Sequence, residues 1–222
     1  AFTKLFLDDS VLTFGTSPFT NVGNDSNGIG TFQVSSGDFH NSDGSAIRVK
    51  SHLGSSTQAA DANAVSDLSE WTTNHRLRGR AYNYIRYRFD ADTFPNGLPN
   101  MSVEIQGKKV FDPRNNSTSF SNNPALCIRD FLTDTSFGLK ITTAEINDSA
   151  THHGGFAYAA ARCEDTINSN NRYECNGIFD LSQSPKQILD QLLTSCSGKL
   201  IYQNGKFNLY VGFHNTPSIT LT

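Results

Sequence analysis

Apolar and polar residues alternate over much of the first half of the chain. The alternation runs through "GTFQVSSGDF" (30–39) and "SAIRVKSHLG" (45–54), and residues 4–14 hold two short apolar runs on either side of Asp8-Asp9-Ser10. A two-residue period is typical of strands that bury one face, and the polar break in 4–14 predicts a hairpin. The alanine-rich stretch 56–72 predicts one short helix in the same region.

The longest alternating run lies within "RLRGRAYNYIRYRFD" (76–90), where two kinds of side chain fall on opposite parities. One set is mostly apolar and the other is basic and aromatic: Leu77, Ala81, Ile85, Tyr87 and Phe89 against Arg78, Arg80, Tyr82, Tyr84, Arg86 and Arg88. This pattern predicts a long strand over 77–89 with one face in the core. Prolines and an Asn-Gly pair predict a turn over 90–100. A second strand over 101–112 completes the antiparallel ribbon that we expect here.

After a polar loop at 113–123 the apolar period becomes helical. Asn123 and Pro124 suit the N-cap and the first position of a helix that ends before Gly138. Another helix is predicted within 142–165, where it begins or is interrupted at a Gly-Gly pair.

The last part of the chain carries the strongest local signals. Residues 172–180 predict a strand, and Ser184, Pro185 and Gln187 form a capping-box signature for the helix that follows. Two apolar runs flank Asn204-Gly205, which is the turn pair that a two-residue β-hairpin prefers. We therefore expect a helix followed by a hairpin over 184–212.

Together these elements predict an α+β, β-rich fold. We expect an N-terminal β-rich region over 1–43, inserted or peripheral, then an antiparallel β domain over 44–118 and a smaller helix-containing α+β domain over 119–222. The final "SITLT" has the pattern of a strand under way, so the chain is expected to be a segment of a longer polypeptide.

Composition narrows the class of protein without indicating a chemistry. The chain has 222 residues, 36% of them hydrophobic, and a formal net charge of −3, which suits a globular protein with a core of its own. No stretch approaches about 18 consecutive apolar residues, so no membrane span is expected.

The four cysteines lack the CxxC spacing of zinc and redox motifs. Cys127 and Cys196 lie in apolar helical contexts and are expected to be small buried hydrophobes. Cys163 and Cys175 have two further interpretations, since they could pair across an asparagine-rich loop or bind a metal with His152 and His153. Free thiols are the simplest expectation for all four.

No familiar catalytic motif is present, and we expect no catalytic, cofactor-binding or metal-binding residues in this segment. Asp130 and Asp134 share a helix face at i, i+4, where like charges are usually just solvated. Asp112 precedes Pro113-Arg114 and is expected to cap a turn. The chain is therefore predicted not to be an enzyme.

The basic and aromatic face of 78–88 leaves three interpretations open. Arginines interleaved with aromatic residues are typical of nucleic-acid-binding strands, and Arg and Tyr are also enriched at protein–protein interfaces. Ordinary solvation is the third. The rest of the chain is acidic on balance and offers no second basic element to build a groove. An interface or an ion-paired outer face is therefore favoured over nucleic acid.

Several strings resemble the tip attachment proteins of the protein J type, the central tail hub proteins of long-tailed, siphovirus-type bacteriophages. The strings at Arg76–Ala81, Phe94–Pro99 and Gly107–Arg114 follow one another in the family's order, and "HLGSSTQAAD" (52–61) is similar to an earlier family motif. Residues 121–139 and 173–212 resemble the two stretches that come next. The resemblance covers 44–222, and residues 1–43 show no clear match.

This resemblance implies a structural role in the virion. Hub proteins of this family are β-rich homotrimers that line or close the end of the tail tube, and they contact the distal tail protein, other tail tip proteins and the tape measure protein. They take part in tail assembly, host attachment and genome ejection, and they meet viral DNA only transiently in the channel. The implied location is the tail tip, assembled in the cytoplasm of the host bacterium, with no cofactor. The alternatives are a tail-associated cell-wall hydrolase and a DNA-contacting tail channel protein.

Overall fold

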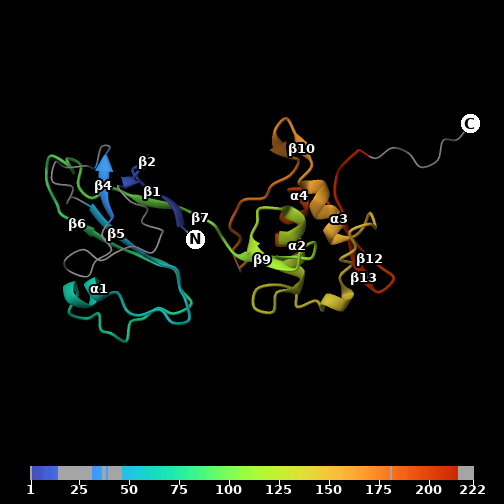
Figure 1. Cartoon of the computed structure of the whole chain (residues 1–222), viewed down its shortest axis with the longest axis horizontal. Helices are drawn as coiled ribbons and strands as arrows, with labels where there is room; N and C mark the ends of the chain where they lie inside the picture. Colours follow the sequence, from blue (N-terminus) through green and yellow to red (C-terminus); the bar gives the residue numbers. More distant parts are fainter. Residues whose placement is uncertain (1, 15–31, 37–38, 40–46, 181, 215–222) are drawn as a thin grey trace, which may run out of the picture. The chain divides into compact units, whose positions relative to one another are not determined.

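The computed structural model describes residues 2–14, 32–36, 39, 47–180 and 182–214. The chain divides into two compact units, Ala1–Gly107 and Lys108–Thr222. The described residues form a mixed α+β structure of small antiparallel sheets and four α-helices (Figure 1). The predicted α+β class is thus confirmed at this level.

The first unit contains two sheets. The three-stranded sheet has the order β2-β1-β7 and consists of Ser10–Val11, Phe2–Leu7 and Met101–Ile105. The four-stranded sheet has the order β3-β4-β5-β6 and consists of Thr13–Phe14, Phe32–Ser36, Ile47–His52 and Tyr82–Tyr87. The predicted hairpin at Asp8-Asp9 is confirmed, because both residues have positive φ and join β1 to β2.

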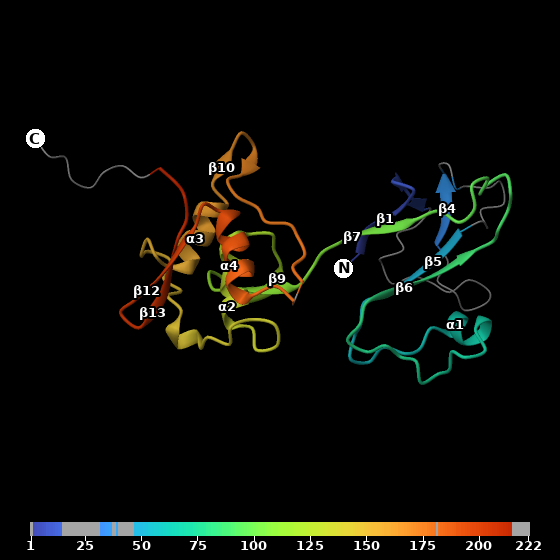
Figure 2. The same ribbon diagram turned by 180° about the vertical axis from the view of Figure 1, so that it is seen from behind.

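The core of the first unit joins side chains from both sheets. It consists of Leu5, Leu7, Leu12, Ile47, Val49 and Phe94, with Phe39, Ile85 and Tyr87 packed against it. Between β5 and β6 the chain makes a long excursion that carries α1 (Ala62–Asp67) (Figures 1 and 2).

The predicted ribbon of 77–89 with 101–112 is wrong. β6 pairs with β5 along its whole length, from Ile47 opposite Tyr87 to His52 opposite Tyr82, whereas β7 pairs with β1. The connection at 90–100 turns the chain from one sheet to the other, and Phe94 within it is buried in the core between them. The buried apolar face of β6 is shorter than expected, because Ala81 and Phe89, which were expected to lie on it, are exposed.

The boundary between the units lies before the position expected from the sequence. β1 belongs to the first unit through its pairing with β7, so residues 2–14 do not form a separate region. β8 (Lys109–Asp112) pairs with β9 (Ser117–Phe120), and Val110 packs into the core of the second unit. The structure therefore divides the chain after Gly107 rather than after 118.

The second unit packs three helices beside a hairpin. The helices are α2 (Pro124–Thr133), α3 (Phe156–Cys163) and α4 (Pro185–Thr194), a short 3-10 turn η1 covers Thr143–Glu145, and the hairpin joins β12 (Lys199–Gln203) to β13 (Lys206–Tyr210) (Figure 2). α2 contacts both α3 and α4, and α3 contacts β13. Buried apolar side chains of α2, α3 and β13 form one core, and partly buried side chains of α4 and β12 pack against it.

The helix caps and the hairpin turn predicted for this unit are confirmed. Asn123 caps α2 through its side chain, and Ser184 and Gln187 form the capping box of α4. Asn204 and Gly205 have positive φ, as the hairpin turn requires. α3 begins after Gly155, so the Gly-Gly pair marks the start of this helix.

The strand predicted over 172–180 is wrong. A two-residue hairpin, β10 (Thr166–Ile167) with β11 (Asn170–Asn171), precedes this segment. The backbone N–H groups of Arg172, Tyr173 and Cys175 donate to carbonyls of loop and helix-end residues instead of to a neighbouring strand. In the described part of the chain no helix is long and apolar enough to cross a membrane.

Candidate functional site

The most elaborately supported surface feature is a tight turn at residues 76–80, here called the arginine turn. Leu77 and Gly79 have positive φ, and the Arg80 N–H donates to the Leu77 carbonyl at 3.0 Å. Arg76, Arg78 and Arg80 are all exposed. The sequence predicted part of a regular strand here, but the structure forms a loop that presents three guanidinium groups.

The buried side chain of Gln58 holds the arginine turn in place through hydrogen bonds. Its side chain is only 8% exposed, and its Nε2 donates to the carbonyls of Arg76 and Leu77 at 2.9 Å each. Its Oε1 accepts from the Gly54 N–H at 2.8 Å. A single buried amide therefore joins the loop after β5 to the turn before β6.

Gly54 lies against the same turn with no room for a side chain. Its φ is +78°, and a Cβ added there would lie 2.8 Å from backbone atoms of Arg80. The Gly54 carbonyl in turn accepts from the Gly79 N–H at 3.0 Å. Only glycine combines this conformation with such a close backbone approach.

Asp61 stabilises the segment that carries Gly54 and Gln58. Its carboxylate caps α1 by accepting from the N–H groups of Asn63 and Ala64, and its Oδ2 lies 2.6 Å from His52 Nε2. Burial raises the pKa of this carboxyl, but hydrogen bonds from His52 and the backbone, with Lys50 at 3.7 Å, outweigh that effect and hold the pKa at about 2. Asp61 is thus a buried carboxylate ionised at neutral pH.

Aromatic rings connect this support to the start of β6. His52 stacks on Tyr82 with ring centroids 4.5 Å apart, and Trp71 contacts Tyr82 at 6.5 Å and His75 at 5.0 Å. Stacked rings of this kind add stability beyond the area that they bury. The arginine turn therefore rests on a rigid base.

The three guanidinium groups of the turn make few bonds of their own. Arg76 Nε donates to the Thr73 carbonyl and Arg78 Nε to the Gln58 carbonyl, each at 3.3 Å. Among the residues that the structure describes, none of the three forms an ion pair with a carboxylate. Exposed arginines without an ion-pair partner, carried on a fixed backbone, are suited to binding carboxylate or phosphate groups.

The basic face of β6 itself differs from the turn. Arg86 Nε lies 3.1 Å from Asp67 Oδ2, and the Tyr84 hydroxyl donates to the same carboxylate at 2.5 Å. Asp67 is the last residue of α1, so this helix supplies a counter-charge to the strand. This part of the face is ion-paired, which is one of the two arrangements favoured from the sequence.

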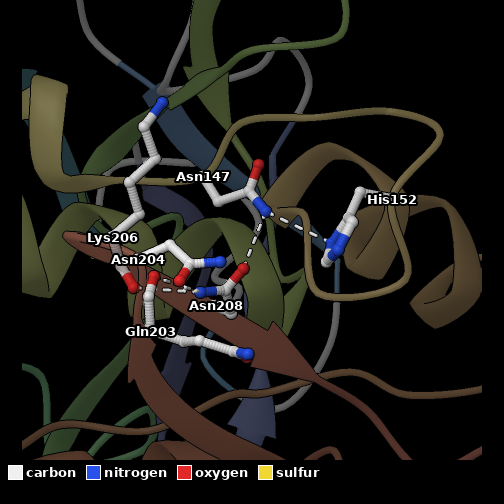
Figure 3. A pocket seen from close by; sticks show the side chains of 6 residues that line it. All are labelled: Asn147, His152, Gln203, Asn204, Lys206 and Asn208. Atoms are coloured by element: carbon white, nitrogen blue, oxygen red, sulfur yellow. Dashed lines mark hydrogen bonds between the residues drawn. The ribbon is translucent and has the colours of Figure 1, made fainter.

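A polar hollow of about 180 Å³ lies on the second unit. It is lined by Asn147, His152, Gln203, Asn204, Lys206 and Asn208 (Figure 3). Asn147 Nδ2 donates to Asn208 Oδ1 at 2.8 Å, and Asn208 Nδ2 donates to the Lys206 carbonyl at 2.9 Å. These amides join the loop before α3 to the β12–β13 turn. None of these six lining residues is acidic, and Figure 3 shows Lys206 extending away from Asn147 and Asn208.

The histidines singled out from the sequence lie near this hollow but do not converge with the cysteines. His152 Nδ1 accepts from the Gly154 N–H at 3.0 Å, and His153 stacks on Tyr158. Within the described residues no group of three histidine, cysteine or acidic side chains could hold a metal ion. The structure thus gives no support to a metal site formed by Cys163, Cys175, His152 and His153.

The cysteines are free thiols in an arrangement that the sequence did not indicate. Cys163 and Cys196 are fully buried in the core of the second unit, whereas Cys127 and Cys175 are half-buried. Cys127 is therefore less enclosed than expected. The thiol that most affects the pKa of Cys175 is that of Cys127 rather than that of Cys163.

Two predictions about carboxylates have different outcomes. Asp112 does cap the turn after β8, since its Oδ1 accepts from the Arg114 N–H at 2.9 Å. Asp130 and Asp134 are not simply solvated, because the Lys108 ammonium lies between them and binds both. The i, i+4 spacing did not reveal this cation, which comes from the preceding strand region.

Replacing Gln58 with alanine should loosen the arginine turn. The change leaves the carbonyls of Arg76 and Leu77 and the Gly54 N–H without their partner, which costs roughly 1–3 kcal/mol. We expect trypsin to cleave after Arg76, Arg78 or Arg80 about tenfold faster or more. Each 1.4 kcal/mol changes the equilibrium between the closed and the opened turn about tenfold. Thr57→Ala, at an exposed neighbouring position, should leave the cleavage rate unchanged. Equal rates for the two variants would contradict the role assigned to Gln58.

Comparison with known proteins adds no relative: no protein-family model matches the chain, and no curated protein matches it.

Proposed function

We propose that this chain is part of a central tail hub protein of a long-tailed bacteriophage. The observation that carries the proposal is the ordered series of family-like strings at 52–61, 76–81, 94–99, 107–114, 121–139 and 173–212. Such a protein is a structural component of the tail tip. It lines or closes the tail tube and acts in tail assembly, host attachment and genome delivery.

The positions of these strings support a structural rather than a catalytic role. The string at 52–61 supplies Gly54 and Gln58, which hold the string at 76–81 in place, and Asp61, which caps α1 and binds His52. The string at 94–99 contributes Phe94 to the core of the first unit. Their side chains are engaged in fixing backbone and core, which is what a part of a rigid assembly needs.

The remaining features of the proposal follow the family. The protein is a homotrimer with antiparallel β hub domains, and its neighbours are the distal tail protein, other tail tip proteins and the tape measure protein. Viral DNA passes the hub transiently during ejection. The protein resides in the virion after assembly in the host cytoplasm.

The arginine turn is the contact surface that we assign to this function. Its guanidinium groups project from a fixed backbone, so the loop itself loses little backbone entropy when a partner binds them. Arginine is also among the residues that dominate binding energy at protein interfaces. We assign it to carboxylate groups on a neighbouring tail protein.

The proposal is tested by locating the protein in purified phage. Antibodies raised against this segment should label the tail tip in electron micrographs, and cross-linking of the full-length protein should trap a trimer. Absence of the protein from purified tails, or a full-length protein that stays monomeric at high concentration, would contradict the proposal.

The contact surface is tested by removing its charge. Arg76, Arg78 and Arg80 are replaced together by alanine in the full-length protein, and phage yield and tail length distribution are measured. We expect at least a tenfold loss of infectious particles, since each truncated interface arginine can cost more than about 1 kcal/mol. Lys109, Lys186 and Lys199 provide a control of the same charge change at exposed positions. The control should assemble normally, and equal losses for both variants would refute the assignment.

The alternative of a DNA-contacting channel protein rests on the same three arginines. It requires binding to double-stranded DNA that weakens steeply with salt and is abolished by the triple alanine variant. Binding of that kind, combined with normal tail assembly by the variant, would favour the alternative over a protein contact.

A further inference from the structure

Two cysteines that are far apart in the sequence meet at one end of α2. Cys127 lies in this helix, and its Sγ contacts the Ser121 carbonyl at 3.6 Å. The N–H of Cys175 donates to the carbonyl of the adjacent Asn122 at 2.8 Å. Each thiol is the largest single influence on the pKa of the other, as expected for two side chains that lie close together. Backbone and side-chain contacts thus agree in placing the thiols together.

These two thiols differ from the other two in their access to solvent. Cys163 and Cys196 have no exposed surface, whereas Cys127 and Cys175 are both half-buried. A small disulfide reagent must approach the sulfur that it reacts with, so only the second pair meets this condition.

We propose that Cys127 and Cys175 form a disulfide by exchange with a low-molecular-weight disulfide of the glutathione type. The Cys175 thiolate attacks one sulfur of oxidised glutathione, whose S–S bond breaks and releases one glutathione thiolate. The Cys127 thiolate then attacks the Cys175 sulfur of the mixed disulfide and releases the second glutathione. Two protein thiols are oxidised, one glutathione disulfide is reduced, and the two thiol protons end on the two glutathione molecules.

The surroundings of the pair assign the order of attack. The neighbouring Cys127 side chain lowers the Cys175 pKa against the opposing effect of burial. The pKa of Cys127 is raised, first by its proximity to Cys175 and then by burial. Cys175 is therefore the attacking thiol, and Cys127 resolves the mixed disulfide.

The disulfide would fasten a segment that has few other attachments. Residues 174–180 form no strand ladder, and Ile178 is 92% exposed. Besides the cysteine contact, the segment reaches α2 through the ring of Phe179, which lies 5.8 Å from that of Phe131. A covalent bond between Cys175 and α2 would hold this segment at one position on the helix.

The test is incubation of the chain with oxidised glutathione, followed by alkylation in denaturant and peptide mapping without reductant. We expect alkylatable thiols to fall from four to two and one linked peptide pair to contain Cys127 and Cys175. Cys127→Ser should stop at the mixed disulfide and retain one glutathione on Cys175. Cys163→Ala, which removes the other partner considered for Cys175, should still form the bond.

Three results would overturn the inference. They are four alkylatable thiols after incubation, a linked pair containing Cys163 or Cys196, and a stable glutathione adduct on Cys175 in the unmutated chain. The mapping of the unmutated chain is decisive by itself, so a variant that fails to fold does not affect the outcome.

Discussion

Replacing Asp61 with alanine is expected to lower the free energy of unfolding of the first unit by about 4 kcal/mol. The variant removes the N-cap of α1, worth about 1 kcal/mol. It also leaves His52 and Lys50 without the buried carboxylate that they surround, and breaking a buried ion pair in this way costs about 3–5 kcal/mol. These contributions share one carboxylate, so they do not add fully.

Trp71 provides a local measurement of this effect. It is the only tryptophan of the chain and contacts Tyr82 in the support of the arginine turn. Urea unfolding followed by its fluorescence should show the loss as a shifted midpoint. Asp67→Ala removes the same charge from the other end of α1, where the ion pair with Arg86 is partly exposed, and should cost less than about 1 kcal/mol. Equal shifts for the two variants would contradict the role given to Asp61.

The same carboxylate makes the first unit sensitive to acid in a defined range. The pKa of Asp61 is about 2 in the folded chain against its ordinary value of 3.8. A lowered folded-state pKa contributes stability that is complete above the unfolded value and is lost as the pH falls through the folded value. Wild-type protein should therefore lose about 2 kcal/mol between roughly pH 5 and pH 1. Asp61→Asn should lack this component of the pH dependence when the same unfolding measurement is repeated across that range.

The sequence predicted the elements whose signals lie within a few residues of one another. The hairpins at Asp8-Asp9 and Asn204-Gly205 and the caps at Asn123 and Ser184 all depend on local backbone preferences, and all are present. Strand pairing depends on distant contacts that alternation does not encode. Alternation does not distinguish a distant partner such as β1 from the neighbouring β6, and the ribbon prediction failed for that reason.

The candidate site was harder to predict because its support is polar. The sequence indicated the arginines, but the residues at 76–81 are compatible with both a strand and a turn. What decides between them is Gln58 bonding to two carbonyls about twenty positions away and Gly54 lying against Arg80. The string at 52–61 was noticed only as a resemblance, and no local pattern assigns its glutamine a partner.

Replacing Gly155 with alanine is expected to destabilise the second unit by about 3 kcal/mol. A Cβ at this position would lie 1.9 Å from the Ser149 carbonyl oxygen, which is well inside van der Waals contact. The oxygen has little freedom to move, because it accepts from the Tyr158 N–H at 3.1 Å, and the nearby Asn147 carbonyl accepts from the Phe156 N–H. Relieving the overlap must displace bonds at the start of α3, and overpacking of this kind costs about 1–3 kcal/mol or more.

Gly177→Ala is the matched control for this change, since a Cβ there meets no atom within 4 Å. Thermal unfolding followed by circular dichroism should give a control midpoint close to wild type and a clearly lower one for Gly155→Ala. Hydrogen exchange adds a local measurement, because the amides of Tyr158 and Ala159 bond to Ser149 and Gly155 and should exchange faster only in the Gly155 variant. If both variants unfold at the wild-type temperature, the loop at 147–152 can move aside without cost, and the hydrogen bonds that join it to α3 contribute little to the stability of the unit.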